Sequence, residues 1–349
     1  MLTHVPYLVD GWIDWGSMLP QLFTYTWMWG GRGIGKTYGC LEQFRLDHPK
    51  KFMLMRRTQP QIDMLWKPIF NPFADLDRQR NVHTCIVKDG SVGVFYDGYV
   101  DPESNEIKPQ GKLLGIAVAM SVMHNLRGID MSDIDVVIYD EFIPEAHARN
   151  TIKNEYEALL NVLETIGRNR ELQGRPPLQF IGLTNSNQLG NAYFLGLGVI
   201  RVVQKMIDKK TEVWTDPDRG LMLIQVTHSP ISEKKKGTAL YKLAGQGAFS
   251  DMSLGNEYTA DVCSHQGSFP LQEVVPQCAV GEICIYRHKS KPLWYVTSHV
   301  SGSPVRYGAD DTSLRRFKKE WWMLWVDYLS YRVVFQDILC EILFKKYFA

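Results

Sequence analysis

One short segment constrains this chain more than any other. Residues 30–37 fit the pattern G-x-x-x-x-G-K-[ST] and read Gly30, Gly31, Arg32, Gly33, Ile34, Gly35, Lys36 and Thr37. Glycines in such a loop let backbone N–H groups curl around a phosphate without Cβ clashes. The lysine can place its charge between the β- and γ-phosphates, and the hydroxyl can bind Mg²⁺. The segment therefore predicts a loop that binds ATP, with Mg²⁺ held in part by Thr37.

The residues on either side of the loop agree with this prediction. Residues 23–29 are aromatic and β-branched, which is typical of a strand that enters the loop, and residues 37–45 are typical of a helix that leaves it. A helix N-terminus adds its own attraction for anions. The alternative is a glycine-rich turn that binds nothing, because a short motif can match by chance.

Composition limits the classes of protein to which the chain can belong. A length of 349 residues favours two domains, at roughly 100–200 residues each. The net charge of +1 excludes a uniformly basic nucleic-acid coat. The six cysteines form no C-x-x-C pair, which argues against a zinc site or a disulfide scaffold. No apolar run reaches the length of a membrane span and no signal-peptide pattern is present, so we expect a soluble cytoplasmic protein.

The order of strand-like and helix-like segments predicts the fold class. They alternate over residues 1–205, as in an α/β domain built on a parallel sheet, so we expect a P-loop ATPase domain there. Charge runs and glycines mark residues 206–265 as a linker subdomain. Residues 266–349 read as a smaller α+β domain that closes with a helix over residues 313–348.

A pair of acids follows a strongly apolar strand-like run. Residues 134–139 read IDVVIY and lead into Asp140 and Glu141. Beside a phosphate loop, Asp140 is expected to bind the Mg²⁺ shell and Glu141 to act as general base for the attacking water. A hydrolase needs such a carboxylate, whereas a small-molecule kinase has to exclude water. The alternative is a strand that ends in a solvated acidic turn.

Further polar residues are candidates for the same site. Asn185 follows the strand expected over residues 178–184, and ligands bind at the carboxyl ends of parallel strands, so we assign it a γ-phosphate-sensing role. A turn-forming asparagine is the alternative.

Several arginines could also serve the chemistry. Arg168 and Arg170 follow the helix expected over residues 151–166. They could reach a neighbouring subunit's γ-phosphate, or they could only complement the helix dipole. The sequence leaves three roles open for the remaining arginines near the site, namely a nucleotide contact, a contact at a subunit interface or a surface ion pair. These residues are Arg32, Arg56, Arg57 and Arg127.

Taken together, these segments resemble the DNA-packaging ATPases of small φ29-like tailed phages. The stretches that match, in the family's order, are GGRGIGKTYG at 30–39, MRRTQP at 55–60, VIYDEF at 137–142, NEYEALLNVLETIGRNRE at 154–171, GLTNSN at 182–187, NAYF at 191–194 and DMSLGNEYTAD at 251–261. The phosphate loop is generic, whereas the other stretches are more specific to the family.

The resemblance implies a fold, an activity and partners. It implies an ATPase core of the additional-strand catalytic-glutamate type, related to the FtsK/HerA translocases, and a C-terminal domain with a vestigial RNase H-like nuclease fold. It implies a pentameric ring in the host cytoplasm that docks at the portal of a prohead and on a structural packaging RNA, and drives double-stranded DNA inward. The site roles it implies are phosphate and Mg²⁺ binding for Lys36 and Thr37, metal binding and catalysis for Asp140 and Glu141, coupling for Asn185, and a trans-acting arginine at Arg168.

The last domain carries few of the residues that nuclease chemistry needs. A two-metal nuclease requires carboxylates clustered on central strands. The expected first strand of this domain, residues 283–286, has no acid at its centre, and Asp310 and Asp311 are expected in a loop. We therefore expect no nuclease activity. The alternative functions are a cellular FtsK/HerA-like double-stranded DNA translocase, a terminase large subunit with an active nuclease, or a nucleotide-binding switch that is not a motor.

Overall fold

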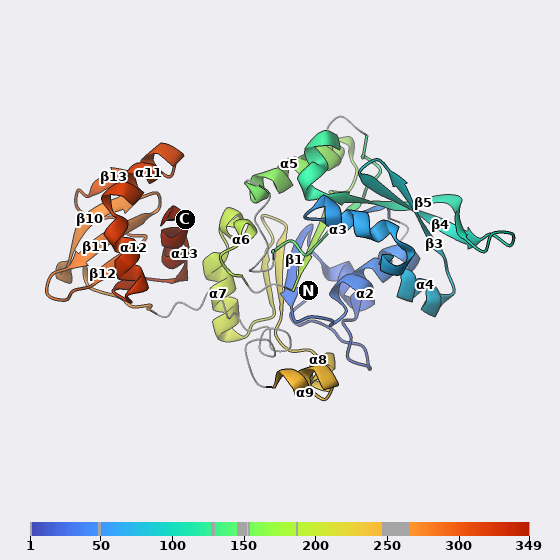
Figure 1. The fold of residues 1–349 in the computed structure, drawn as a ribbon, viewed down its shortest axis with the longest axis horizontal. Helices are drawn as coiled ribbons and strands as arrows, with labels where there is room; N and C mark the ends of the chain where they lie inside the picture. The colour runs from blue at the N-terminus through green and yellow to red at the C-terminus, as the bar shows by residue number, and fades with distance from the viewer. Residues whose placement is uncertain are drawn as a thin grey trace. The chain divides into compact units, whose positions relative to one another are not determined.

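The computed structural model describes residues 2–47, 50–126, 130–144, 152, 154–185, 188–245 and 265–348. The chain divides into two compact units, one of residues 1–196 and 206–259, and the other of residues 197–205 and 260–349 (Figure 1). Among the helices of the described residues, none has the length and apolar character that crossing a bilayer requires.

The first unit is built on a nine-stranded sheet in the order β3-β4-β5-β2-β6-β7-β1-β9-β8. The strands that run parallel are β5 (Ile107–Ala119), β2 (Phe52–Arg56), β6 (Val136–Asp140), β7 (Gln179–Thr184), β1 (Tyr25–Gly30) and β9 (Leu221–Val226). Antiparallel strands extend both sides of this set, namely β3 (Thr84–Asp89) and β4 (Val92–Val100) beside β5, and β8 (Val213–Asp216) beside β9. The predicted α/β fold is confirmed.

Alternating side chains of β1 contribute to the core on both faces of the sheet, because successive residues of a strand point to opposite sides. Met28 belongs to the same buried cluster as Leu41 of α2 (Lys36–Glu42). On the other face, the Trp27 ring lies 5.3 Å from the ring of Tyr193, which belongs to α6 (Ala192–Leu197). Helices therefore cover both faces of the sheet, and Figure 1 shows α2 and α6 on opposite sides of β1.

The remaining α-helices that lie wholly within this unit precede, connect or follow its strands. They are α1 (Trp15–Met18), α3 (Gln59–Asp63), α4 (Ala74–Arg80), α5 (Glu155–Gly167), α8 (Pro230–Lys236) and α9 (Ala239–Ala244). Helix α2 continues as one turn of π-helix over Gln43–Asp47.

The strand order fixes which side chains can meet. Strand β7 lies between β1 and β6, with Thr184 opposite Trp29 on one side and Leu183 opposite Asp140 on the other. Strand β2 follows on the far side of β6. The carboxyl ends of these parallel strands therefore meet at one edge of the sheet, where ligands bind in folds of this kind.

The division into units differs from the predicted domain boundaries. Residues 206–265 were expected to form a linker subdomain, but β8 and β9 lie within this range and belong to the sheet of the first unit. Strand β9 pairs in parallel with β1 over its whole length, and all of its residues are buried. Strand β9 joins this sheet because its sequence, LMLIQV, is apolar enough for an interior position, even though charged residues lie near it in the chain.

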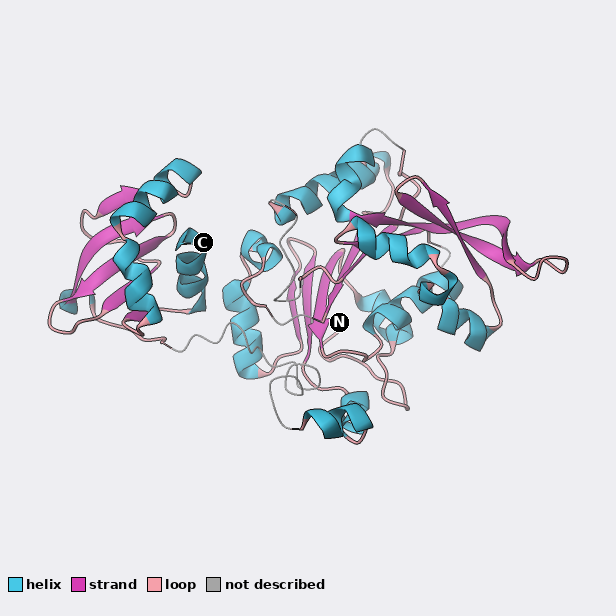
Figure 2. Ribbon diagram, in the orientation of Figure 1, coloured by secondary structure: helices cyan, strands magenta, loops and turns pink. Residues whose placement is uncertain are grey.

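The second unit has a five-stranded sheet in the order β13-β10-β11-β12-β14. Its strands are β10 (Val274–Val280), β11 (Ile283–His288), β12 (Trp294–Thr297), β13 (Val305–Tyr307) and β14 (Val333–Phe335). Figure 2 shows the helices of this unit beside the sheet. Residues 200–205 of helix α7 (Ile200–Lys209) are grouped with this unit, and Arg201 forms an ion pair of 2.9 Å with Asp337.

Three sequence predictions for the second unit are wrong, the third only in part. The closing helix expected over residues 313–348 is interrupted, and the segment forms α11 (Asp311–Glu320), α12 (Trp322–Leu329), β14 and α13 (Ile338–Phe348). Tyr331 takes a left-handed φ of 58°, and the β-branched run after it pairs with β12. The strand expected first is second, because β10 precedes β11. Asp311 begins α11 rather than lying in a loop, whereas Asp310 precedes the helix and caps it by accepting a hydrogen bond from the Ser313 amide.

Candidate nucleotide-binding site

The phosphate loop connects the end of β1 at Gly30 to the start of α2 at Lys36, as the sequence predicts. Gly33 and Gly35 have φ angles of 60° and 92°, in the left-handed region that favours glycine. A Cβ at Gly30 would lie 2.7 Å from the Cβ of Val226 in β9. Glycine is therefore required for the loop's curvature at Gly33 and Gly35, and for close packing of the neighbouring strand at Gly30.

Lys36 is buried beneath this loop. Its Nζ donates hydrogen bonds to the carbonyl oxygens of Gly30, at 3.0 Å, and Gly31, at 2.6 Å. Burial is the main reason that the pKa of Lys36 falls from 10.5 to about 7, while the negative charge of Asp140 opposes this shift and the nearby cations Lys235 and Arg32 add to it. An anion bound in the loop would stabilise the charged form of this lysine.

Thr37 and Asp140 lie in direct contact across β7. The Thr37 hydroxyl donates to Oδ1 of Asp140 at 2.9 Å, and the Asp140 side chain is buried. A hydroxyl and a carboxylate oxygen are hard ligands of the kind that Mg²⁺ prefers. These two residues fit the predicted metal site, because loop and acid come together although more than a hundred positions separate them in the chain.

Glu141 has a strained backbone. Its φ is 57°, which for a residue other than glycine costs on the order of 1–3 kcal/mol and is often found at functional sites. Its amide donates to Oδ1 of Asp140 at 3.1 Å, and its carboxylate Oε2 accepts a hydrogen bond of 3.2 Å from Gln61 of α3. The turn holds both acids at the same edge of the sheet, with Glu141 43% exposed and Asp140 6% exposed.

Arg56 contacts both acids. It ends β2, the strand next to β6, and its guanidinium lies 2.8 Å from Oδ2 of Asp140 and 3.0 Å from Oε2 of Glu141. The sequence identified Arg56 only as one of several cations near the site. The adjacency of β2 and β6 is what brings it to the acids, and that adjacency is a property of the strand order.

Arg57, the next residue, has a structural role. Its side chain is buried, forms a bidentate ion pair with Glu155 at the start of α5, and donates to the carbonyl oxygen of Phe142 at 3.1 Å. Because side chains alternate along a strand, Arg56 and Arg57 point in different directions. Arg57 therefore ties α5 to the segment that follows the two acids.

Asn185 lies where the sequence places it. It comes directly after Thr184, the last residue of β7, and β7 separates the phosphate-loop strand from the acidic strand. Its position is thus at the same edge as Thr37 and Glu141. Its sensing role stays a prediction.

The arginines after α5 lie at the other edge of the sheet. Arg168 forms an ion pair of 3.2 Å with Asp130, and Arg170 is buried and donates to Asp135 at 2.6 Å, both acids being residues that precede β6. The five residues of β6 separate this edge from Asp140 by about 16 Å. The structure therefore does not bring Arg168 to the loop of its own chain, and it gives Arg170 a structural contact. Arg127 lies outside the described residues.

Two contacts with the loop come from segments that the sequence did not connect with it. Trp15 donates its indole N–H to the carbonyl oxygen of Gly35 at 3.0 Å. Lys235 of α8 donates from Nζ to the carbonyl oxygen of Arg32 at 2.5 Å. No local sequence signal could reveal either contact, because the first joins positions 20 residues apart and the second joins positions 203 residues apart.

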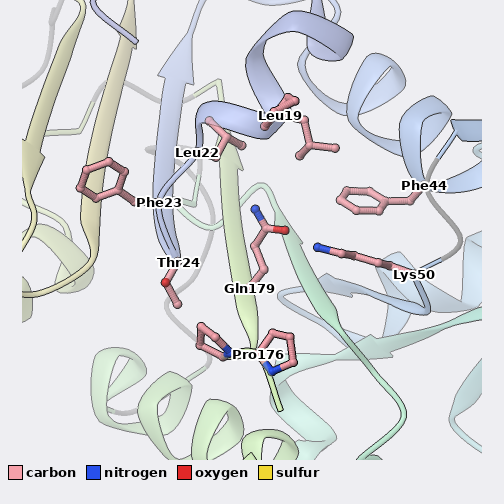
Figure 3. A pocket seen from close by; sticks show the side chains of 10 residues that line it. Leu19, Leu22, Phe23, Thr24, Phe44, Lys50, Pro176 and Gln179 are labelled. Atoms are coloured by element: carbon pink, nitrogen blue, oxygen red, sulfur yellow. The ribbon is translucent and has the colours of Figure 1, made fainter. Parts of the chain in front are cut away.

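A separate pocket lies away from this chemistry. Its volume is about 360 Å³, and its lining includes Thr24 before β1, Lys50 before β2 and Gln179 at the start of β7. Figure 3 shows Lys50 and Gln179 pointing toward each other near Phe44. All these positions mark the amino ends of the parallel strands, so the pocket is on the opposite edge of the sheet from the phosphate loop.

A glycine-rich loop between a strand and a helix, whose hydroxyl contacts an acid at the carboxyl edge of a parallel sheet, defines a P-loop nucleotide-binding protein. A comparison with models of protein families also assigns the chain to a family. The model of the podovirus DNA encapsidation protein (Gp16) family matches residues 16–266, and the chain belongs to this family.

Individual relatives agree with this assignment. The DNA packaging protein of Bacillus phage phi29 is 28% identical over 237 residues, which are 66% of this chain and 61% of the relative. The chain thus spans about three fifths of the length of the curated relatives that it matches, as the 61% and 63% coverage of the phi29 and B103 phage proteins indicates.

Two solved structures share the fold. A chain of the bacteriophage Phi-29 viral genome packaging motor assembly has a TM-score of 0.66 and 19% identity, with 96% of this chain and 99% of that chain covered. The Phi-28 gp11 DNA packaging motor has a TM-score of 0.63 and 16% identity, with 96% of each chain covered. At these identities the likeness concerns the fold alone.

Proposed function

We propose that this protein is an ATP-driven motor that moves double-stranded phage DNA into a preformed prohead. The observation that carries the proposal is the contact of Thr37 with Asp140, because it joins the phosphate loop and the acidic strand into one site. Family membership and the names of the relatives, a DNA packaging protein and a genome packaging motor assembly, support the coupling of this site to DNA. The position of β7 between β1 and β6 supports assignment to the additional-strand catalytic-glutamate class.

In the proposed reaction, the loop amides and Lys36 would bind the triphosphate, while Thr37 and Asp140 would hold Mg²⁺. The ion would neutralise charge on the phosphate oxygens. Glu141 accepts a proton from a water molecule as that water attacks the γ-phosphorus, and the bond to the bridging oxygen breaks to give ADP and phosphate. Arg56 and Gln61 both contact Oε2 of Glu141, so Oε1 is the oxygen proposed to accept the proton of the water.

Arg168 is proposed to act on the nucleotide of a neighbouring subunit. The motivation is its ion pair with Asp130, a residue that precedes β6, which places Arg168 at the edge of the sheet opposite its own acids. A guanidinium supplied by a neighbour can raise the rate of phosphoryl transfer by ~10³–10⁵. We propose a ring, five-membered by resemblance to the φ29-like family, that docks at the portal vertex and on a structural packaging RNA in the host cytoplasm. Asn185 is proposed to sense the γ-phosphate.

The second unit is proposed to lack nuclease activity. Its central strand β11 carries no carboxylate, and Asp310 already caps α11. Its likeness to RNase H remains a proposal from the family resemblance. Mn²⁺-dependent cleavage of plasmid DNA that required residues after 265 would contradict this part of the proposal and favour a terminase.

The test of the proposed chemistry is the substitution Glu141→Gln, which keeps the side-chain shape and removes the base. Steady-state ATP hydrolysis should fall by about 10²–10⁴-fold, while nucleotide binding is retained. Glu157→Gln on the exposed face of α5 is the matched control and should hydrolyse at the wild-type rate. Packaging by purified proheads, this protein and ATP tests the motor function itself. Normal turnover in Glu141→Gln would overturn the assignment of the base, and packaging without ATP consumption would overturn the motor.

A further inference from the structure

A second lysine reaches the phosphate loop from a distant part of the chain. Helix α8 contains three consecutive lysines, of which Lys235 is half-buried and its two neighbours are exposed. The Lys235 ammonium donates to the carbonyl oxygen of Arg32, in the middle of the loop. A Cβ at Gly33 would clash with this ammonium, so the missing side chain at Gly33 is what admits Lys235.

Helix α8 is held in place beside the loop by contacts other than that of Lys235. The Lys234 ammonium donates to the carbonyl oxygen of Asp10 at 2.5 Å, and the Ser229 hydroxyl donates to that of Gly11 at 3.4 Å. Gly11 has a φ of 100°, and a Cβ there would lie 3.0 Å from the Cβ of Pro230. The segment before β1 thus packs closely on the start of α8, and Lys235 is positioned before any ligand binds.

Three cations lie at the loop, namely Lys36, Arg32 and Lys235. Lys235 contributes to the lowered pKa of Lys36, which the negative charge of Asp140 opposes. Burial also lowers the pKa of Lys235 itself. Within the described part of the chain no acidic side chain forms an ion pair with Lys235, whereas Lys236 pairs with Glu233 at 2.7 Å. A half-buried cation with a neutral partner is poorly compensated, and a phosphate would compensate it.

We infer that Lys235 is a second phosphate-binding lysine, whose ammonium moves from the carbonyl oxygen of Arg32 to a phosphate oxygen of the nucleotide held by the loop. The inference rests on the proposed function only in that the loop binds a nucleoside polyphosphate. It adds a contact from α8, which lies beyond β9 at the edge where the phosphate loop and the acids meet. A surface lysine that merely caps a loop carbonyl is the competing explanation.

The experiment measures equilibrium binding of a fluorescent, non-hydrolysable ATP analogue to the full chain. Lys235→Ala should weaken binding by about tenfold, the usual loss for a hydrogen bond to a charged group. Lys236→Ala, which removes the same charge one position further on, should stay within about twofold of the wild type, and Lys235→Arg should restore part of the loss. Circular dichroism and the urea midpoint verify that each variant is folded.

A salt titration gives a second readout that a purely structural role would not change. The loss of affinity with rising salt should be shallower for Lys235→Ala than for Lys236→Ala, because one fewer charge contacts the phosphates. Equal affinities and equal slopes for the two variants, with binding still abolished by Lys36→Ala, would overturn the role of Lys235 and leave the proposed function intact. Failure of the wild type to bind, or normal binding by Lys36→Ala, would instead overturn the proposed function, and this inference with it.

Discussion

The buried ion pair between Arg57 and Glu155 gives a quantitative test of how α5 is attached to the site. The two side chains are only 6% and 7% exposed, and the same guanidinium also donates to Phe142. The substitution Glu155→Gln keeps the volume of the side chain and an acceptor oxygen but removes the negative charge. Arg57 is then left buried with neutral partners only.

The expected loss of stability follows from that burial. Removing one partner of a buried ion pair lowers the free energy of unfolding by about 3–5 kcal/mol. Because glutamine keeps an acceptor oxygen, we expect Glu155→Gln to lower it by about 3 kcal/mol. Such a loss is a large share of the ~5–15 kcal/mol that stabilises a typical domain. For a unit of this size it corresponds to a fall in melting temperature of about 6–12 °C.

Hydrogen–deuterium exchange of α5 and β6 peptides across a urea series is the suitable assay, because it reads the first unit separately from the second. Asp75→Asn is the control, since the Asp75–Arg78 pair is 68% and 76% exposed and should contribute at most about 1 kcal/mol. Combining Glu155→Leu with Arg57→Met removes both buried charges and should recover most of the stability. A loss in Glu155→Gln no larger than that in Asp75→Asn would refute the reasoning.

Two further predictions concern the nucleotide. The pKa of Lys36 is about 7, so above pH 7 this lysine is mostly neutral in the free protein. A bound phosphate favours its charged form. ATP binding at pH 8.5 should therefore take up as much as one proton. Calorimetric titration in two buffers of different ionisation enthalpy measures this uptake, which Lys36→Arg should remove, and identical heats in both buffers would contradict it. Arg168→Ala should be inactive in a uniform ring, yet its mixture with Lys36→Ala subunits should regain part of the ATPase activity, since each variant supplies what the other lacks. A mixture as inactive as the two parents would count against action in trans.

The sequence predicts the phosphate loop and the acids well because both signals are local. Residues 30–37 form a motif within eight positions, and Asp140 and Glu141 end a strand that is apolar enough to recognise. The rule that ligands meet at the carboxyl ends of parallel strands then brings these acids to the loop. The same reasoning gives Asn185 its position after β7.

The parts that the sequence could not predict depend on strand order and distant packing. Arg56 and Arg57 are adjacent and alike in sequence, yet one contacts the acids and the other is buried against α5, which only the pairing of β2 with β6 decides. Nothing in the sequence distinguishes Lys235 from Lys234 and Lys236, its neighbours in a run of three lysines. The linker boundary was misplaced because the apolar run of β9 pairs with β1, about two hundred positions earlier, and no local signal shows that pairing. Strand β14 was missed because three residues are too short a strand to stand out within an aromatic, helix-like segment.

If Arg168 acts in trans as proposed, its placement has a consequence for energy use. If each subunit binds ATP at one edge of its sheet and carries the activating arginine at the other edge, isolated subunits would bind ATP without hydrolysing it. Consumption would begin only when copies stand side by side, so that wasteful turnover is avoided before a motor has been assembled.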